Sequence, residues 1–312
     1  MTARVLALSG GIGGAKLALG LYQTLGAGEL AVLVNTADDF EHLGLHISPD
    51  IDTLLYTLAG LADPERGWGR AGETWQFMAE LRRLGGEDWF SLGDKDLALH
   101  VERTRQLRGG ASLTAITGAI AGQYGIKAQI LPMSDQPVRT ILTTDAGVLE
   151  FQQYFVGLRA QPVVRSIEYR GAGAVAANPA ALDLLADPAL EAVILCPSNP
   201  WLSIAPLLAI PALRAALSAC RAPVVAVSPI VGGAAIKGPT AKIMAELGLP
   251  VTAAAVARYY SELLDGYVLD RADSGMAQNL GLPALTTATV MKNDEDKRRL
   301  AREVLAFARR LT

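Results

Sequence analysis

The sequence predicts an α/β fold, namely a Rossmann-like, doubly wound and mostly parallel sheet that carries an inserted subdomain of helices and strands. Short, continuously apolar runs alternate with helical patterns at both ends of the 312-residue chain. Such runs are typical of parallel strands that are covered by helices on both faces. A glycine-rich stretch follows the first run directly, and the middle of the chain has a different pattern. Together these observations favour a nucleotide-binding core with an insertion.

The first two elements enclose the glycine-rich turn. Residues 4–8 predict a strand and residues 15–25 predict a helix, with four glycines between them. These glycines are Gly10, Gly11, Gly13 and Gly14. A turn of this kind lets a phosphate approach the backbone and rest on the N-terminus of the following helix. We expect Gly11 and Gly13 to lie where a Cβ atom would touch the phosphate or strain the turn.

Lys16 decides which known phosphate motif the turn can form. It stands where the dinucleotide fingerprint G-x-G-x-x-G has its third glycine, and Leu17 follows it where a P-loop needs serine or threonine. The turn therefore matches neither motif. We interpret Lys16 as a counter-charge for phosphate, with a solvated side chain as the alternative.

The remaining core elements follow the same pattern of apolar run, loop and helix. Further strands are predicted at residues 30–35, 192–196 and 223–228. The last two lead into loops rich in serine, proline or glycine and then into helical patterns. Residues 294–311 predict an amphipathic helix with charges on its solvated face.

The middle of the chain predicts the insertion. Its pattern is helical from residue 73 to residue 123 and strand-like from residue 127 to residue 169, including residues 148–156. We therefore predict a nucleotide-binding core formed by residues 1–60 and 171–312. Residues 61–170 are predicted to form an inserted subdomain that contributes to the acceptor site.

Composition and charge exclude several classes of protein. The chain is 51% hydrophobic and 19% charged, which favours a large core and little disorder. The net charge of −3 and the pI of about 5.7 argue against nucleic acid as a partner. Cys196 and Cys220 are too few for a disulfide scaffold and fit free thiols in a reducing cytoplasm. Residues 192–213 carry no charge, but their four prolines oppose a membrane span, so we expect a cytoplasmic protein.

Five segments are expected to form one crevice, because ligands of open α/β sheets bind beyond the carboxyl ends of the strands. Ser198, Asn199 and Ser228 lie in these segments and can hold a base, a ribose or a phosphate, with turn formation as the alternative. The segments are the glycine-rich turn and residues 35–39, 46–52, 197–200 and 228–233.

Four carboxylates crowd into two of these segments: Asp38, Asp39, Asp50 and Asp52. Crowded carboxylates repel one another unless a cation neutralises them. Mg²⁺ held by one or two of them, together with oxygens of a substrate phosphate, is the usual solution. The alternative is that Asp50 only favours the start of a helix. The stretch Asp94-Lys95-Asp96 likewise either begins a helix, with Asp94 as its N-cap, or belongs to the site.

Eight motifs resemble those of the 2-phospho-L-lactate transferase family, and their order and spacing extend over almost the whole chain, to about Asp270. Eight separate motifs are far more specific than the glycine-rich turn alone. They are SGG…G…KL (residues 9–17), VNTADD (34–39), ISPDIDT (47–53), RGWG (66–69), LGDKD (92–96), LPMSD (131–135), PSNP (197–200) and VSPI (227–230).

The resemblance implies a transferase of coenzyme F-420 biosynthesis. Members of the family join a three-carbon acid, activated by guanosine diphosphate, to the ribityl hydroxyl of 7,8-didemethyl-8-hydroxy-5-deazariboflavin (Fo). They release GMP and require Mg²⁺. The acid is phospholactyl, phosphoenolpyruvyl or phosphoglyceryl, and no residue decides which one this chain uses. The implied partners are therefore small molecules, without nucleic acid or membrane, and the implied assembly is a homodimer.

The resemblance also implies site residues at the matching positions. Asp50 and Asp52 are the expected catalytic residues, with Asp52 the more sensitive to substitution, and Asp38 joins them as a metal ligand. Fo is expected to contact Asp50 and Asp52, and also Ser91 and Asp94. Ser91 stands where some members of the family have a basic residue. The nucleotide donor is expected to contact Gly10, Gly11, Gly13, Gly14, Lys16, Asn35, Ser198, Asn199 and Ser228.

Two other functions remain open at this point. The fold also resembles, more distantly, regulatory proteins that bind nucleotide-sugars without catalysis, and these would leave Asp50 and Asp52 without a role. A nicotinamide-dependent oxidoreductase would need an acidic residue at the end of the second strand, where Asn35 stands.

Overall fold

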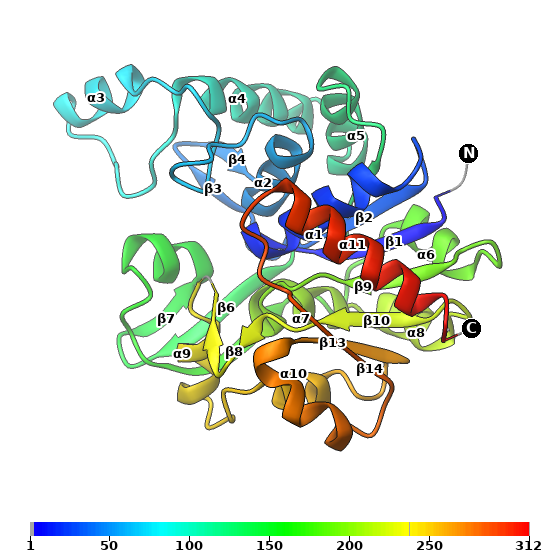
Figure 1. Cartoon of the computed structure of the whole chain (residues 1–312). Helices are drawn as coiled ribbons and strands as arrows, with labels where there is room; N and C mark the ends of the chain where they lie inside the picture. The colour runs from blue at the N-terminus through cyan, green and yellow to red at the C-terminus, as the bar shows by residue number, and fades with distance from the viewer. Residues whose placement is uncertain (1–2, 237, 312) are drawn as a thin grey trace.

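A seven-stranded, all-parallel sheet forms the centre of the protein in a computed structural model that describes residues 3–236 and 238–311 (Figure 1). Each pair of neighbouring strands runs parallel. The predicted α/β class is confirmed, because the strands are short buried apolar runs separated by helices. In spatial order the strands are β14 (Ala284–Thr287), β13 (Gly266–Asp270), β10 (Val224–Val227), β9 (Ala192–Leu195), β1 (Val5–Ser9), β2 (Leu30–Val34) and β5 (Gln129–Pro132).

The strand order reverses between β1 and β9. From β1 the chain adds β2 and then β5 on one side, whereas β10, β13 and β14 follow β9 on the other side. The register pairs Ser9 with Val34 and Leu8 with Leu195, so the loops after these three strands leave the sheet at the same level. Such a reversal creates the crevice in which open α/β sheets bind ligands.

Helices cover both faces of the sheet, and each face has its own apolar core. Side chains alternate along β1, so that Val5 and Ala7 belong to one core, and Leu6 and Leu8 to the other. The first core is covered by α1 (Gly11–Thr24), α2 (Pro49–Leu58), α5 (Leu113–Gln123) and α11 (Asp294–Ala308). The second is covered by α6 (Pro179–Ala186), α7 (Ala205–Leu208), α8 (Pro211–Ala219) and α10 (Ala253–Tyr259).

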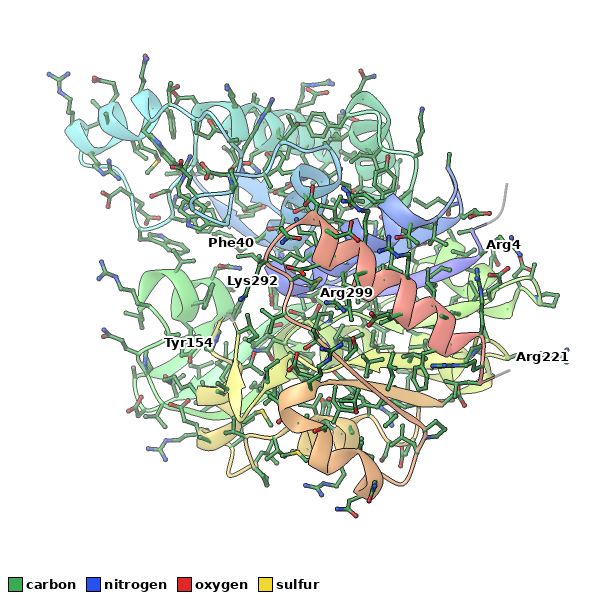
Figure 2. All side chains as sticks on the ribbon, in the orientation of Figure 1. Arg4, Phe40, Tyr154, Arg221, Lys292 and Arg299 are labelled. Atoms are coloured by element: carbon green, nitrogen blue, oxygen red, sulfur yellow. The ribbon has the colours of Figure 1, made fainter. Side chains whose placement is uncertain are left out.

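Two smaller units lie beside the central sheet, one at the upper left and one at the lower left of Figure 1. In Figure 2, Phe40 marks the upper unit and Tyr154 marks the lower one. The upper unit contains the hairpin β3 (Phe40–His42) and β4 (Leu45–Ile47) with α3 (Gln76–Arg83) and α4 (Asp94–Arg108). The lower unit is an antiparallel sheet of β7 (Gly147–Glu150), β6 (Arg139–Thr144) and β8 (Val164–Arg170), with a π-helix, η1 (Gln153–Gly157).

The structure corrects two features of the predicted insertion. The strand β5 lies within residues 61–170 but pairs with β2 in the central sheet, so the core sheet divides the predicted insertion into two units. The strand-like pattern of residues 148–156 is also only partly a strand. The strand ends at Glu150 and a helical segment follows, which brings Phe151 and Phe155 onto one face, where their rings stack.

The remaining elements complete the walls and edges of the core. They are η2 (Pro200–Ile204), β11 (Ile230–Val231), β12 (Ala234–Ala235), α9 (Thr240–Glu246) and η3 (Arg271–Asn279). Cys196 is buried and Cys220 partly buried, and both are free thiols as predicted. Among the described residues, no single helix has the length and apolar character to cross a membrane. Within the described part of the chain, one pair of helices, Pro200–Leu208 and Pro211–Ala219, has together the length and composition of a membrane span, but the two are bent by 86° relative to each other.

Candidate active site

A pocket of about 680 Å³ lies at the carboxyl ends of the parallel strands. All five segments that the sequence predicts to form one crevice contribute to its wall, as do Thr289, Val290 and Met291 after β14. The prediction of a single crevice is therefore confirmed. Both smaller units also contribute wall residues, which makes the pocket large enough for more than one small ligand.

The glycine-rich turn forms the first turn of α1 rather than a separate loop. The helix begins at Gly11, whose φ of +64° is the left-handed conformation that favours glycine. The expectation that Gly11 prevents backbone strain is thus confirmed.

The reason for Gly13 differs from the expected contact with phosphate. A Cβ atom on Gly13 would lie 2.6 Å from the carbonyl oxygen of Pro197, so the position is closed by the protein itself. Gly14 packs against Ser9 and Ser198 and does not line the pocket. Substitutions at these two positions would therefore report on packing before they report on ligand binding.

The N-terminus of α1 faces one end of the pocket. The backbone nitrogen of Gly10 donates to Ser198 Oγ at 3.2 Å, and that of Gly11 donates to Asp50 Oδ1 at 2.7 Å. Lys16 also lines the pocket, and its Nζ donates to the carbonyl oxygen of Met291 at 3.1 Å. The helix dipole and the lysine make this end of the pocket favourable to an anion.

Small polar side chains in the loops after β9 and β10 complete this end of the pocket. Asn199 Oδ1 accepts from the backbone nitrogens of Trp201 and Leu202, at 3.0 and 3.1 Å, so the predicted turn-forming role is present. Asn199 Nδ2 is buried and has no partner among the described residues. Asn199 also lines the pocket, so this amide is a candidate donor to a ligand. Ser228 also lines the pocket, and its hydroxyl bonds to Ile230 in a local turn.

Asn35 connects two of the predicted carboxylates. It is fully buried behind the pocket wall, and its Nδ2 lies 3.1 Å from Asp38 Oδ2 and 3.0 Å from Asp50 Oδ2. The structure therefore places Asn35 as a support for the two carboxylates, whereas the sequence predicts a contact with the nucleotide.

Asp38 and Asp50 both line the pocket and lie in an unfavourable environment for two negative charges. Burial, and then the charge of Asp50, raise the pKa of Asp38 well above its usual value. Burial raises the pKa of Asp50 to about 6, although hydrogen bonds from Asn35 and Gly11 act in the opposite direction. Asp38 Oδ1 is buried and has no partner among the described residues. These observations fit a pair of carboxylates that a cation would stabilise.

Asp52 lies apart from this pair, although it follows Asp50 on α2. Its two oxygens bind the guanidinium of Arg103, with Nη1 at 3.1 Å from Oδ2 and Nη2 on Oδ1. No three side chains of His, Cys, Asp or Glu in the described parts of the chain are placed to hold a metal ion together. The predicted site of Asp38, Asp50 and Asp52 is thus not formed, because Arg103 neutralises the third carboxylate.

Sequence reasoning did not single out the polar cluster around Asp52. His100 Nδ1 lies 3.7 Å from Asp52 Oδ2, its Nε2 lies 3.1 Å from Asp96 Oδ2, and Tyr56 donates to Asp96 at 2.5 Å. Three of these residues, Asp96, His100 and Arg103, stand at positions i, i+4 and i+7 of α4 and therefore share one face. That spacing is the signal from which the cluster could have been found.

The other end of the pocket is apolar and aromatic. The rings of Phe151 and Phe155 stack with centroids 5.3 Å apart and an interplanar angle of 12°. Trp68, Phe90 and Ser91 line the same pocket from the opposite unit. Aromatic walls suit a planar ring system, because stacked rings attract one another beyond the burial of their area.

Asp94 does not line the pocket, although the sequence predicts it in the acceptor site. Its carboxylate accepts from the Thr74 hydroxyl and from the backbone nitrogens of Gln76 and Phe77, at 3.2 and 3.1 Å. These hydrogen bonds, that from Thr74 first, lower the pKa of Asp94. The carboxylate therefore stabilises the start of α3, which is also where a helix favours negative charge.

The fold and this pocket define a class of protein, namely an α/β protein whose ligand site at the carboxyl ends of the parallel strands has one anion-binding end and one aromatic end. The chain matches the family described as 2-phospho-L-lactate transferase CofD over residues 5–308 and belongs to that family.

Relatives with known names support the same assignment. A 2-phospho-L-lactate transferase of Methanosarcina mazei is 40% identical over 304 residues, which cover 96% of this chain and 99% of the relative. A phosphoenolpyruvate transferase of Streptomyces griseus subsp. griseus is 38% identical over 314 residues, which cover 98% of each chain. These relatives are enzymes by name, and the alternative of a non-catalytic regulatory protein is not supported.

A solved structure also shares the fold. The crystal structure of a UPF0052 family member from Bacillus halodurans has a TM-score of 0.62, covering 98% of this chain and 99% of that protein. Its sequence identity is 13%, so the likeness concerns the fold alone.

Proposed function

We propose that this transferase moves a phospho-linked three-carbon acid from a guanosine-diphosphate-activated donor to the ribityl hydroxyl of Fo and releases GMP. One observation carries the proposal beyond family membership: the N-terminus of α1 and the aromatic wall belong to the same pocket. A phosphorylated donor and a planar acceptor can therefore meet in one crevice, next to the carboxylates of α2.

The polar end of the pocket suits the donor. The N-terminus of α1 and Lys16 favour its phosphates. Asn199 Nδ2 and Ser228 are hydrogen-bonding groups in the same part of the wall. Gly10 and Gly11 bring backbone rather than side chain to the pocket, which permits close approach of a phosphate.

The aromatic end suits the acceptor. Phe151 and Phe155 from the lower unit, and Trp68 and Phe90 from the upper unit, offer flat surfaces to the deazaflavin ring. Asp52, in the first turn of α2, lines the same pocket. The hydroxyl groups of a ribityl chain donate hydrogen bonds, which a carboxylate accepts readily.

Asp38 and Asp50 are the residues that would hold Mg²⁺. Their raised pKa values and the unpartnered Asp38 Oδ1 fit a site in which two carboxylates and substrate oxygens share a divalent cation. When bound, Mg²⁺ would supply the positive charge that phosphoryl transfer needs on the reacting phosphate oxygens.

The chain's own residues would contribute mainly by positioning. The backbone of α1 and Lys16 orient the donor so that its distal phosphorus faces the acceptor hydroxyl. Asn35 and the Gly11 N–H group hold Asp50 in place, so that this carboxylate is fixed before the substrates bind. The identity of the three-carbon acid, the homodimer and the cytoplasmic location stay predictions.

Binding of Fo tests the acceptor end. Phe155→Leu is expected to weaken Fo binding about tenfold, because the variant loses a stacking surface of roughly 1 kcal/mol or more. The intrinsic fluorescence anisotropy of Fo, titrated with protein, measures the affinity. GDP binding, measured by calorimetry, is expected to be unchanged.

Val148→Ala is the matched control for this prediction. Val148 lies in the same small sheet and is 64% exposed, but it does not line the pocket. Equal Fo affinity in Phe155→Leu, Val148→Ala and the unmodified protein would remove the aromatic wall from the acceptor site.

A further inference from the structure

Arg103 is the most deeply buried charged side chain near the pocket. Its exposed fraction is 0%, and its partner Asp52 is 5% exposed. Arg103 belongs to α4 in the upper unit, whereas Asp52 belongs to α2, which packs on the central sheet. The pair therefore joins the two units at a carboxylate that lines the pocket.

Arg103 fixes the orientation of the Asp52 carboxylate and also neutralises its charge. Each oxygen of the carboxylate accepts one N–H group of the guanidinium, which is the two-point arrangement that prevents rotation. Burial acts to lower the pKa of Arg103, but the charge and the hydrogen bonds of Asp52 outweigh it and raise that pKa. The guanidinium of Arg103 therefore keeps its charge beside the carboxylate of Asp52.

Stability alone does not account for a buried pair of this kind. Removing two charges from water costs about as much as their attraction returns, and two apolar side chains of similar volume often stabilise a protein equally well. The location offers a better reason. Asp52, His100 and Asp96 all line the pocket, so the surroundings of Arg103 are part of the wall that a ligand meets.

The two carboxylates of α2 differ because of Arg103. Asp50 shares the amide of Asn35 with the buried carboxylate of Asp38, whereas the carboxylate of Asp52 is paired with the guanidinium of Arg103. A carboxylate that is neutralised and held at both oxygens is a poor ligand for a divalent ion, but its remaining lone pairs can still accept hydrogen bonds from hydroxyl groups.

We propose that Arg103 is a positioning residue of the transfer site, which reserves Asp52 for the hydroxyl groups of the acceptor and leaves Asp50 and Asp38 for the cation. This inference rests on the proposed function. It assigns different tasks to two aspartates that are only two positions apart, and it makes the docking of α4 a condition for acceptor binding.

Three variants separate this role from a merely structural one. Arg103→Met removes the guanidinium and is expected to weaken Fo binding at least about tenfold, while GDP affinity changes less than about twofold. Arg103→Lys keeps the charge but not the two-point contact and is expected to fall between Arg103→Met and the unmodified protein. Arg105→Met is the control, because Arg105 lies on the same helix, is exposed and pairs only with Glu102 among the described residues.

A double variant answers the objection that Arg103→Met leaves Asp52 buried without its partner. Asp52→Asn with Arg103→Met contains no unpaired buried charge, so its melting temperature is expected to recover toward that of the unmodified protein. Fo affinity is expected to stay low in the double variant. Recovery of Fo affinity together with stability would show a purely structural role and overturn the proposal.

Binding of Mn²⁺ to the apo protein, measured by calorimetry, tests the division between the aspartates without any turnover. Asp50→Asn is expected to lose Mn²⁺ binding at least about tenfold, whereas Asp52→Asn changes it less than about twofold. Equal losses in the two variants would overturn the division. If the unmodified protein binds neither Fo nor Mn²⁺, the proposed function itself is wrong. If it binds both and Arg103→Met binds Fo normally, only the role of Arg103 is wrong.

Discussion

Asp50→Asn is expected to lower the rate of transfer at least about a hundredfold, with a change of only a few degrees in the melting temperature. The variant loses a carboxylate that is proposed to hold the cation for the reacting phosphate, and the loss of one such electrostatic contribution typically costs about 3 kcal/mol in the transition state. GMP release by the purified variant, measured at saturating donor and Fo, gives this rate.

The stability of the variant follows from two opposing effects. Asparagine loses the hydrogen bond that Asn35 donates to Asp50 Oδ2, which costs about 1 kcal/mol. It also removes the repulsion with Asp38 that contributes to the raised pKa of that residue. These two changes partly cancel, so inactivity of Asp50→Asn would not reflect unfolding.

Asp94→Asn is the matched control. The carboxylate of Asp94 supports the start of α3 and lies outside the pocket, so this variant is expected to keep its transfer rate. A rate for Asp50→Asn close to that of Asp94→Asn would show that the reactive carboxylate lies elsewhere.

The structure changes what is expected of Asp52→Asn. The sequence alone predicts that this variant loses most activity with little change in melting. Because Arg103 would be left as a buried charge without its carboxylate, we expect a loss of about 3–5 kcal/mol in stability. We therefore expect the melting temperature of Asp52→Asn to be lower than that of Asp50→Asn when the two variants are compared.

Removal of divalent cations is expected to stop transfer. The pKa values of Asp38 and Asp50 are both raised, chiefly by burial, and Asp38 Oδ1 lacks a partner among the described residues. Without a cation, the donor's phosphates would have to approach this negative charge unassisted, and we expect a loss of at least about a hundredfold.

Dialysis against a chelator, followed by GMP release with and without added Mg²⁺ or Mn²⁺, measures the requirement. Activity should return with the added cation, and circular dichroism before and after dialysis shows whether the fold is retained. Full activity in the presence of chelator would contradict the assignment of Asp38 and Asp50 to a cation.

The core of the fold and the position of the crevice could be predicted because their signals are local. The central strands β1, β2, β9 and β10 are short apolar runs, and four of the five crevice segments follow one of these runs directly in the sequence. The topology of parallel sheets then brings the carboxyl ends of the strands together. The order of strands and loops along the sequence is therefore enough to predict where the crevice lies.

The polar cluster could not be predicted in the same way because it depends on docking. Asp52 and Arg103 are 51 positions apart, and only the packing of α4 against β4 and α5 brings them into contact. The roles predicted for Asn35 and Gly13 differ from those in the structure for a related reason. Their residue types fit a phosphate site, but buried carboxylates and the Pro197 carbonyl are their neighbours in the structure.

The central claim is that donor and acceptor react in one pocket. The most direct measurement mixes the purified protein with Mg²⁺, Fo and each of the three guanosine-diphosphate-activated acids in turn, and quantifies GMP and deazaflavin products by chromatography. We predict that one donor yields GMP and a phospho-linked deazaflavin in equal amounts, and that GMP is not released when Fo is omitted. Release of GMP at the same rate without Fo, or no deazaflavin product with any of the three donors, would contradict the account.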